Sequence, residues 1–399
     1  MKSIRELYKI GYGPSSSHTM GPQKACVLFQ QTFPDTVRFK VILYGSLALT
    51  GKGHLTDEII KKTLGDVEVE FNKSFPFSHP NTFEIYGYTL DNTEYFWRVY
   101  SIGGGSIQIE GEETFPSPSI YPHHSFDEIK KYCEQENIRL YEYVERFEGK
   151  EIWIFLDEIY RSMMNTINQG LSKEGTLPGI LKVKRKAKQL LEKVFENEPS
   201  EITESRLVSA YAYATSEENA SGEIVVTAPT CGASGVVPAV MRYMKEKHHF
   251  KKQTCLHALA TAGIIGNIIK HNASISGAVA GCQAEIGSAC SMGAALHAEL
   301  FKLSLHQIEY AAEIAMEHHL GLTCDPVLGY VQIPCIERNA VAALRAIDAC
   351  GLSFFLSESR KISFDMVVET MYQTGKDIHT KYRETGIGGL AELYTKIKG

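Results

Sequence analysis

The sequence lacks the segments that mark secreted, membrane-spanning or nucleic-acid-binding proteins. Residues 1–13 contain no apolar core of the about 7 to 15 residues that a secretory signal needs. The most apolar later stretch, residues 256–269, is interrupted by His257 and Asn267 and is shorter than the roughly 18 residues of a spanning helix. The chain has 41 Lys and Arg against 47 Asp and Glu, and its one basic cluster, residues 182–193, is typical of a solvated helix face. We therefore expect a cytoplasmic protein with no membrane or nucleic-acid partner.

The cysteines lack the spacing of a disulfide framework or a zinc finger. There are nine of them, an odd number, spread along 399 residues with no Cys-x-x-Cys pair. Reduced thiols or a metal centre fit this distribution better than disulfides. The length is sufficient for two domains whose cores need no covalent cross-links.

The pattern of apolar and polar residues changes near residue 122. Before it, apolar and polar residues alternate as in β-strands within residues 36–44, 66–71, 82–90 and 95–110. After it, long segments have helical periodicity, for example residues 126–147, 152–171 and 302–322. The sequence predicts an α+β domain over residues 1–122 followed by an all-α domain over residues 123–399. Three prolines within residues 115–124 make that segment the best linker candidate.

The loop GYGPSSSHTMGP, residues 11–22, concentrates hydroxyl groups ahead of a predicted helix that has Pro22 in its first turn. Free backbone amides at a helix N-terminus favour an anion, so a carboxylate or phosphate could bind there. An ordinary helix cap also explains Ser and Thr in this place. His18 adds a titratable group that a cap does not need. The candidate anion-binding residues are Ser15, Ser16, Ser17 and Thr19.

Two further glycine-rich turns follow predicted strands. Residues 45–57, GSLALTGKGHLTD, present Lys52, His54 and Thr56, and match neither a Walker A motif nor a G-x-G-x-x-G motif. The alternative for this turn is a flexible connection with an exposed histidine. Residues 101–106, SIGGGS, could bring backbone close to a ligand or simply form a bulge.

In the second half, Cys324 and Cys335 flank a loop in which Pro326 and Pro334 prevent a regular helix. Two cysteines on an irregular loop can turn toward one point. Cys282 and Cys290 are eight residues apart and would share roughly one face of a continuous helix. Most isolated cysteines are small buried apolar residues, so the residues alone indicate no more than a candidate thiolate metal site.

These motifs together resemble the iron–sulfur L-serine dehydratases in their single-chain form, with a β-type domain followed by an α-type domain. The likeness extends over nearly the whole chain and is carried by GPSSSHTMGP, GSLALTGKGH, SIGGG, NASGEIVVTAPT, GCQAEIG, CDPVLGYVQIPCIERN and KYRETGIGGLA. The resemblance implies conversion of L-serine to pyruvate and ammonia at a [4Fe–4S] cluster, and a homodimer. The cluster's three cysteine ligands would be Cys282, Cys324 and Cys335.

The same resemblance suggests roles for the two glycine-rich loops. A base must remove the Cα proton, and we expect His54 to be this base, with His18 as the second choice. The SSSHT loop would supply donors to the substrate carboxylate. Weaker candidates for substrate contact are Lys52, Thr56, Asn272, Ser274 and Arg383. Because the loops and the cysteines come from different domains, the site is expected between the domains.

Two other functions remain open at this point. A pyridoxal-phosphate dehydratase would perform the same reaction through a Schiff-base lysine, for which Lys52 is the candidate. A non-enzymatic sensor would bind a small acid and use the cysteines as a redox or zinc switch.

A further expectation concerns the C-terminal tail: longer relatives end in a cysteine, whereas the last cysteine here is Cys350. We expect water or hydroxide on the fourth iron, and deletion of residues 393–399 should leave the affinity for serine nearly unchanged.

Overall fold

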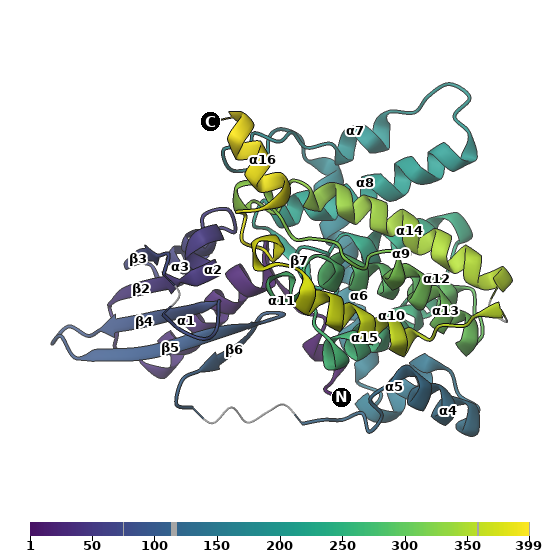
Figure 1. The fold of residues 1–399 in the computed structure, drawn as a ribbon, viewed down its shortest axis with the longest axis horizontal. Helices are drawn as coiled ribbons and strands as arrows, with labels where there is room; N and C mark the ends of the chain where they lie inside the picture. The colour runs from purple at the N-terminus through teal and green to yellow at the C-terminus, as the bar shows by residue number, and fades with distance from the viewer. Residues whose placement is uncertain (75, 113–117, 357–358, 399) are drawn as a thin grey trace.

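A computed structural model describes residues 1–74, 76–112, 118–356 and 359–398 of the chain. A sheet with its covering helices lies to one side, and a larger body of helices lies to the other (Figure 1). This is the predicted order of an α+β region followed by a mainly helical one. The candidate linker at residues 115–124 falls in part outside the described residues, since residues 113–117 are not among them.

The first region is built on a five-stranded sheet with the strand order β3-β2-β4-β5-β6, in which only the β2–β3 pair is parallel. Every run that the sequence predicted as a strand forms one. The strands are β2 (Arg38–Tyr44), β3 (Val67–Asn72), β4 (Thr82–Tyr88), β5 (Glu94–Gly103) and β6 (Ser106–Ile109). The helices are α1 (Gly21–Thr32), α2 (Gly45–Thr50) and α3 (Thr56–Leu64).

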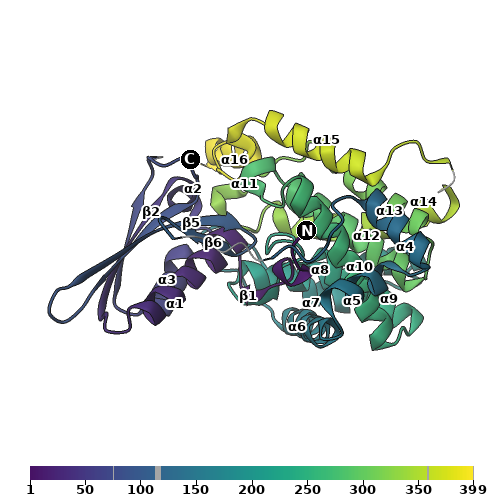
Figure 2. The same ribbon diagram turned by 90° about the horizontal axis from the view of Figure 1, so that it is seen from below.

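Alternation along β2 decides which face of the sheet is buried. Phe39, Val41 and Leu43 point into the small core, where Phe29 of α1 packs edge-on against Trp97. Helices α1 and α3 cover this face (Figure 2). Pro22 lies in the first turn of α1, as the sequence predicted.

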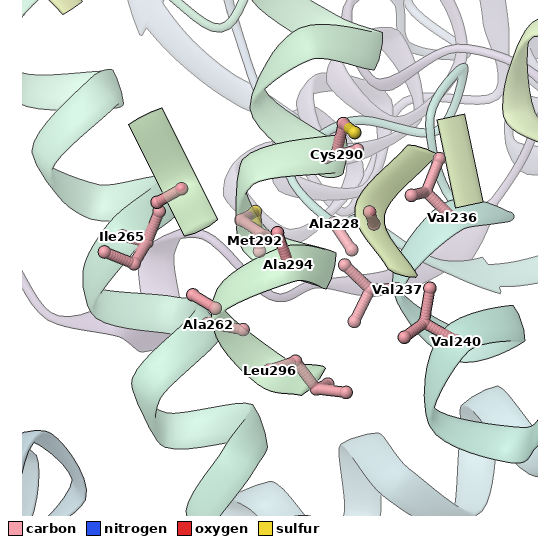
Figure 3. Close-up of a cluster of buried hydrophobic side chains, with 14 of the residues drawn as sticks. Ala228, Val236, Val237, Val240, Ala262, Ile265, Cys290, Met292, Ala294 and Leu296 are labelled. Atoms are coloured by element: carbon pink, nitrogen blue, oxygen red, sulfur yellow. The ribbon is translucent and has the colours of Figure 1, made fainter. Parts of the chain in front are cut away.

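The helical region is organised around α12, whose residues are all buried. Its helices are α4 (Phe126–Glu136), α5 (Leu140–Glu148), α6 (Ile152–Ser172), α7 (Ala187–Glu192), α8 (Ser200–Ala220), α9 (Val236–His248), α10 (Lys252–Asn272), α11 (Gly277–Ala280), α12 (Ser288–Leu300), α13 (Leu305–Glu317), α14 (Cys335–Leu356), α15 (Phe364–Asp377) and α16 (Gly389–Lys398). Figure 3 shows Met292, Ala294 and Leu296 of α12 among side chains of α9 and α10. Small side chains such as Ala294 let these helices approach closely.

Two predicted helices differ from the observed ones. The segment 126–147 is two helices, because Asn137 adopts a left-handed conformation with φ of 51° between α4 and α5. The basic cluster at residues 182–193 is helical only from Ala187, since Lys184 forms a β-bridge with Thr176 before it.

The N-terminal residues cross from one region to the other. Met1, Ile4 and Leu7 are buried in the helical core, and β1 (Ile10–Tyr12) pairs antiparallel with β7 (Ile224–Val226). The start of the chain is therefore held by the helical region before the chain enters the sheet region. The exact domain boundary at residue 122 stays a prediction.

Helix α14 is long and apolar enough to span a membrane by composition, the one such helix in the part of the chain described here. In the 18-residue window that meets this criterion, 44% of the residues are buried inside the protein. Core helices of soluble proteins have the same properties, so this feature indicates no membrane contact by itself.

Candidate active site

Two histidines stack on each other where the two regions meet, and one of them, His54, lines a small cavity there. The rings of His18 and His54 lie 4.4 Å apart at an angle of 25°, and both side chains are fully buried. The two residues come from separate loops. Residues Ser16–Met20 form a π-helical turn that leads into α1, and His54 lies in the turn between α2 and α3. The alternative of a flexible loop with an exposed histidine is therefore wrong for residues 45–57.

Hydrogen bonds define the tautomer of His54. Its Nδ1 lies 2.9 Å from the carbonyl oxygen of Thr50, an acceptor only, so Nδ1 carries the proton and donates it. The Nε2 atom has no hydrogen-bond partner among the described residues. It faces the carboxylate of Glu384 at 3.5 Å. In its neutral form, His54 thus presents a free lone pair at Nε2.

His18 is held in its neutral form. Burial lowers its pKa to about 4, with a further contribution from His54, although Glu384 opposes the shift. Its Nδ1 lies 2.8 Å from the Ser17 hydroxyl and its Nε2 lies 3.1 Å from the Ser46 hydroxyl. At neutral pH one ring nitrogen of His18 is a hydrogen-bond donor and the other an acceptor.

Glu384 reaches the site through backbone pairing near the end of the chain. The amide of Cys324 donates to the carbonyl of Tyr382, and the amide of Glu384 donates to the carbonyl of Cys324, each at 2.8 Å. Burial raises the pKa of the Glu384 carboxyl, but the imidazoles of His54 and His18 outweigh burial and leave it below its ordinary value. Glu384 is accordingly ionised at neutral pH.

Three cysteine thiols line the same cavity, together with Ser15, His54 and Glu384. The thiol sulfurs of Cys282 and Cys324 lie with a Glu285 carboxylate oxygen within 4.8 Å of one another. A hydrogen bond from Cys324 lowers the pKa of Cys282 to about 7 against the opposing effect of burial, and the charge of Arg338 lowers it further. Burial and the neighbouring Cys282 raise the pKa of Cys335.

This donor set fits an iron–sulfur cluster. Thiolates are the soft ligands that iron–sulfur clusters and zinc take, and here three cysteine thiols line one cavity. The cysteines also lie where the backbone can direct them inward. Cys282 precedes the π-helical turn Gln283–Gly287 and Cys335 begins α14. Cys290 lies on the far side of that turn in α12, where its thiol contacts the carbonyl of Ala342.

The backbone of the His54 turn lies directly against the cysteine loop. A Cβ atom added to Gly53 would lie 2.5 Å from the carbonyl carbon and oxygen of Gly329 and 2.9 Å from the amide nitrogen of Tyr330. Real Cβ atoms essentially never approach so closely, so only glycine allows this contact. The contact places the imidazole of His54 beside the loop that carries Cys324 and Cys335.

The serine loop is folded inward and bonded to itself. The Ser15 hydroxyl accepts from the His18 amide at 3.1 Å, which caps the π-helical turn, and the Thr19 hydroxyl donates to the His54 carbonyl at 2.8 Å. Ser101 of β5 donates to the Ser17 carbonyl at 2.6 Å, so the SIGGG segment supports this turn. The same loop therefore caps the π-helical turn and helps to form the site. Ser15, Ser16, Ser17 and Thr19 are all buried.

The other predicted contact residues lie outside the lining of the cavity. Lys52 donates to Asp57 at 2.6 Å with a side chain that is 70% exposed, and the Asn272 amide donates to the His124 carbonyl. The Arg383 guanidinium donates to the carbonyls of Ile378 and Lys376. The Ser274 hydroxyl accepts from the Ser276 amide. None of these side chains lines the cavity as described. Thr56 is fully buried, and its hydroxyl has no partner among the described residues.

The sequence analysis missed three charged residues of the site. Glu384 is adjacent to the predicted Arg383, whose side chain does not line the cavity, so the motif was identified but Glu384 within it was not. Glu285 lies within the motif GCQAEIG, and burial together with Glu384 raises its pKa well above the ordinary value. Arg338 lies three residues after Cys335 and donates to Asp325 and the Thr323 carbonyl. A charged residue inside each cysteine motif was the available signal.

The site has the features of an enzyme: a buried histidine beside three cysteines that could hold a metal. Comparison with known proteins gives the family. The profile of the serine dehydratase alpha chain matches residues 96–391, and that of the serine dehydratase beta chain matches residues 3–67. The chain belongs to the serine dehydratase family, with the beta-type and alpha-type parts in one polypeptide.

Curated relatives match along nearly the whole chain. L-serine dehydratase 1 of Escherichia coli is 40% identical, with 98% of this chain and 99% of the relative covered. L-serine dehydratase of Haemophilus influenzae is 39% identical with the same coverage. L-serine dehydratase of Streptomyces coelicolor is 37% identical, with 98% of each chain covered.

Proposed function

We propose that this protein is an L-serine dehydratase that converts L-serine to pyruvate and ammonia with a [4Fe–4S] cluster. One observation carries the proposal: His54, whose Nε2 has no hydrogen-bond partner among the described residues, lines the same cavity as the three cysteines. Full-length similarity to L-serine dehydratases supports the substrate.

Cys282, Cys324 and Cys335 would hold the cluster. When bound, a cluster with only three protein ligands supplies a Lewis-acidic iron for the departing hydroxyl group. Arg338, which lowers the pKa of Cys282, favours the thiolate form that ligation requires. Cys282 and Cys324 are buried, whereas Cys335 is partly exposed, so two of the three ligands are shielded from solvent.

His54 acts as the base. Its Nε2 accepts the Cα proton, because Nδ1 is already protonated and committed to the Thr50 carbonyl. The proton converts the ring to an imidazolium, which the ionised Glu384 carboxylate at 3.5 Å stabilises. The Cα proton of an amino acid is weakly acidic, so this preorganised charge contributes to the rate.

His18 and the serine loop support the base and the substrate site. His18 stays neutral at working pH and does not compete for the Cα proton, and both of its ring nitrogens are engaged by the hydroxyls of Ser17 and Ser46. The Ser15 side chain lines the cavity on the same wall as His54, where a hydroxyl group can bind a carboxylate. The stacked ring of His18 limits the positions that the imidazole of His54 can adopt.

The pyridoxal-phosphate alternative has less support. Its candidate lysine, Lys52, is largely exposed and paired with Asp57, whereas a Schiff-base lysine is desolvated and unpaired. The sensor alternative gives no reason for the free Nε2 beside the thiols. We further expect a cytoplasmic homodimer without nucleic-acid or membrane partners.

Anaerobic purification followed by iron and sulfide analysis and a pyruvate assay on L-serine tests the proposal. Cys324→Ser is expected to lose iron and activity together. Cys350→Ser, which changes a cysteine of α14 outside the cavity lining, serves as the matched control and should keep both. An active, iron-replete Cys324→Ser protein would contradict the cluster assignment. Pyridoxal phosphate in the active protein would support the alternative.

A further inference from the structure

A second cavity, separate from the thiols, opens at the carboxyl end of α10. It has a volume of about 280 Å³ and is lined by Lys2, Ser119, Asn267, Lys270 and His271. Its lining includes two lysines and no carboxylate. From this cavity, we propose that the protein binds a small phosphorylated anion here, either inorganic phosphate or a phosphomonoester.

The cationic groups of this cavity have no counter-ion in the part of the chain described here. Neither Lys2 nor Lys270 forms an ion pair with a described residue, and Glu6, whose charge acts on Lys270, pairs with Lys9 at 3.4 Å. The Lys270 ammonium donates to the Glu6 carbonyl at 2.8 Å, which leaves two of its three donors available. The site thus has net positive charge and free donors.

Folding brings lysine ammonium groups close together, and their mutual repulsion costs electrostatic energy. Burial lowers the pKa of Lys270 to about 8, and the charges of Lys9 and Lys2 lower it further against the effect of Glu6. A bound dianion relieves this repulsion. The carboxyl end of α10 provides about half a negative charge, which is less than Lys2 and Lys270 together require.

The cavity is built by the start of the chain and α10, and the SIGGG turn borders it. The Asn267 amide donates to the Lys2 carbonyl at 2.7 Å, which fixes the chain start against α10. Lys9 donates to Ser106 at 2.9 Å, next to the SIGGG turn. A Cβ atom at Gly104 would lie 3.9 Å from the Lys270 ammonium, so this turn borders the lysine. SIGGG therefore gains a role in shaping this cluster of cations.

The positive charge of this cavity disfavours L-serine, the substrate of the proposed reaction. L-serine is a zwitterion, and its ammonium group would meet the ammonium groups of Lys2 and Lys270. A phosphoryl group has no cationic part and carries up to two negative charges. Lysine ammoniums and a serine hydroxyl are donors that bind its oxygens.

Thermal unfolding of the anaerobic holoenzyme, at constant ionic strength maintained with chloride, tests this proposal. The two probes are inorganic phosphate and glycerol 3-phosphate. Either probe should raise the Tm in a saturable way, and a shift with glycerol 3-phosphate alone would identify a phosphomonoester as the ligand. Because the readout is binding, it does not depend on dehydratase turnover.

Lys270→Met and Lys2→Met should each weaken binding of the effective probe roughly tenfold, as loss of a charged hydrogen bond predicts. Lys2 is exposed, so its substitution leaves folding intact. Lys251→Met, at the other end of α10, is the matched control and should bind like the parent. Equal Tm shifts in all four proteins, or no shift with either probe, would overturn the proposal.

Discussion

Gly53 and Gly329 are in backbone contact across the two regions of the protein, so close that a Cβ atom on Gly53 would overlap the carbonyl of Gly329. The first glycine precedes His54 and the second lies between Cys324 and Cys335. This contact determines how near the base lies to the thiols.

Gly53→Ala should therefore separate the base from the thiols. The added methyl group meets backbone atoms at 2.5 to 2.9 Å, which cannot move as a flexible side chain does. A displacement of about 1 Å at a reacting group costs about 10²-fold, so kcat/KM should fall by about that factor. Iron content should persist, because Cys282, Cys324 and Cys335 are unchanged. Steady-state kinetics with iron analysis measures both.

A matched substitution of another glycine should raise stability and leave activity unchanged. Gly351 lies within α14, is exposed, and has open space around its Cα. Gly351→Ala should raise the free energy of unfolding by about 0.5 to 1 kcal/mol through helix propensity, with activity unchanged. Chemical denaturation measures the difference. If Gly351→Ala also lost activity, then even an exposed glycine of α14 would not tolerate the added methyl group. The loss in Gly53→Ala could then not be assigned to the contact with Gly329.

His54→Ala should lower turnover roughly 10²- to 10⁴-fold while the iron content is kept, as expected for loss of a general base. The same purified sample is assayed for pyruvate formation and for iron. If only KM rises and kcat is retained, His54 binds substrate and His18 becomes the candidate base.

Glu384→Gln should lower kcat roughly 10- to 100-fold with a smaller effect on KM, because the neutral amide no longer stabilises the imidazolium of His54. Glu392→Gln removes an exposed carboxylate from α16 and is the control. Equal kinetics in the two variants would exclude Glu384 as a positioning residue.

His297 should make the protein sensitive to acid. Burial lowers its pKa to about 4, below the ordinary value of about 6.5, so the unfolded state binds more protons between these two values. Stability is then present above pH 6.5 and falls as the pH drops toward 4. The loss amounts to about 2 kcal/mol at pH 5. His297→Gln should lose less stability between pH 7.5 and pH 5, as measured by chemical denaturation at both values.

The sequence alone determined the local structure of this protein. Alternating residues predicted β2 to β6, helical periodicity predicted the second half, and Pro22 marked the start of a helix, because these features depend on neighbours along the chain. The motifs also gave the family to which the chain belongs.

Only the tertiary structure decided which side chains meet. It buried His54, brought Glu384 to it through pairing with Cys324, and left Lys52 and Arg383 outside the cavity lining. It also placed the first residues of the chain in the helical core. These outcomes depend on packing between segments distant in sequence, and no local periodicity records which distant backbone a turn such as Gly53 will contact.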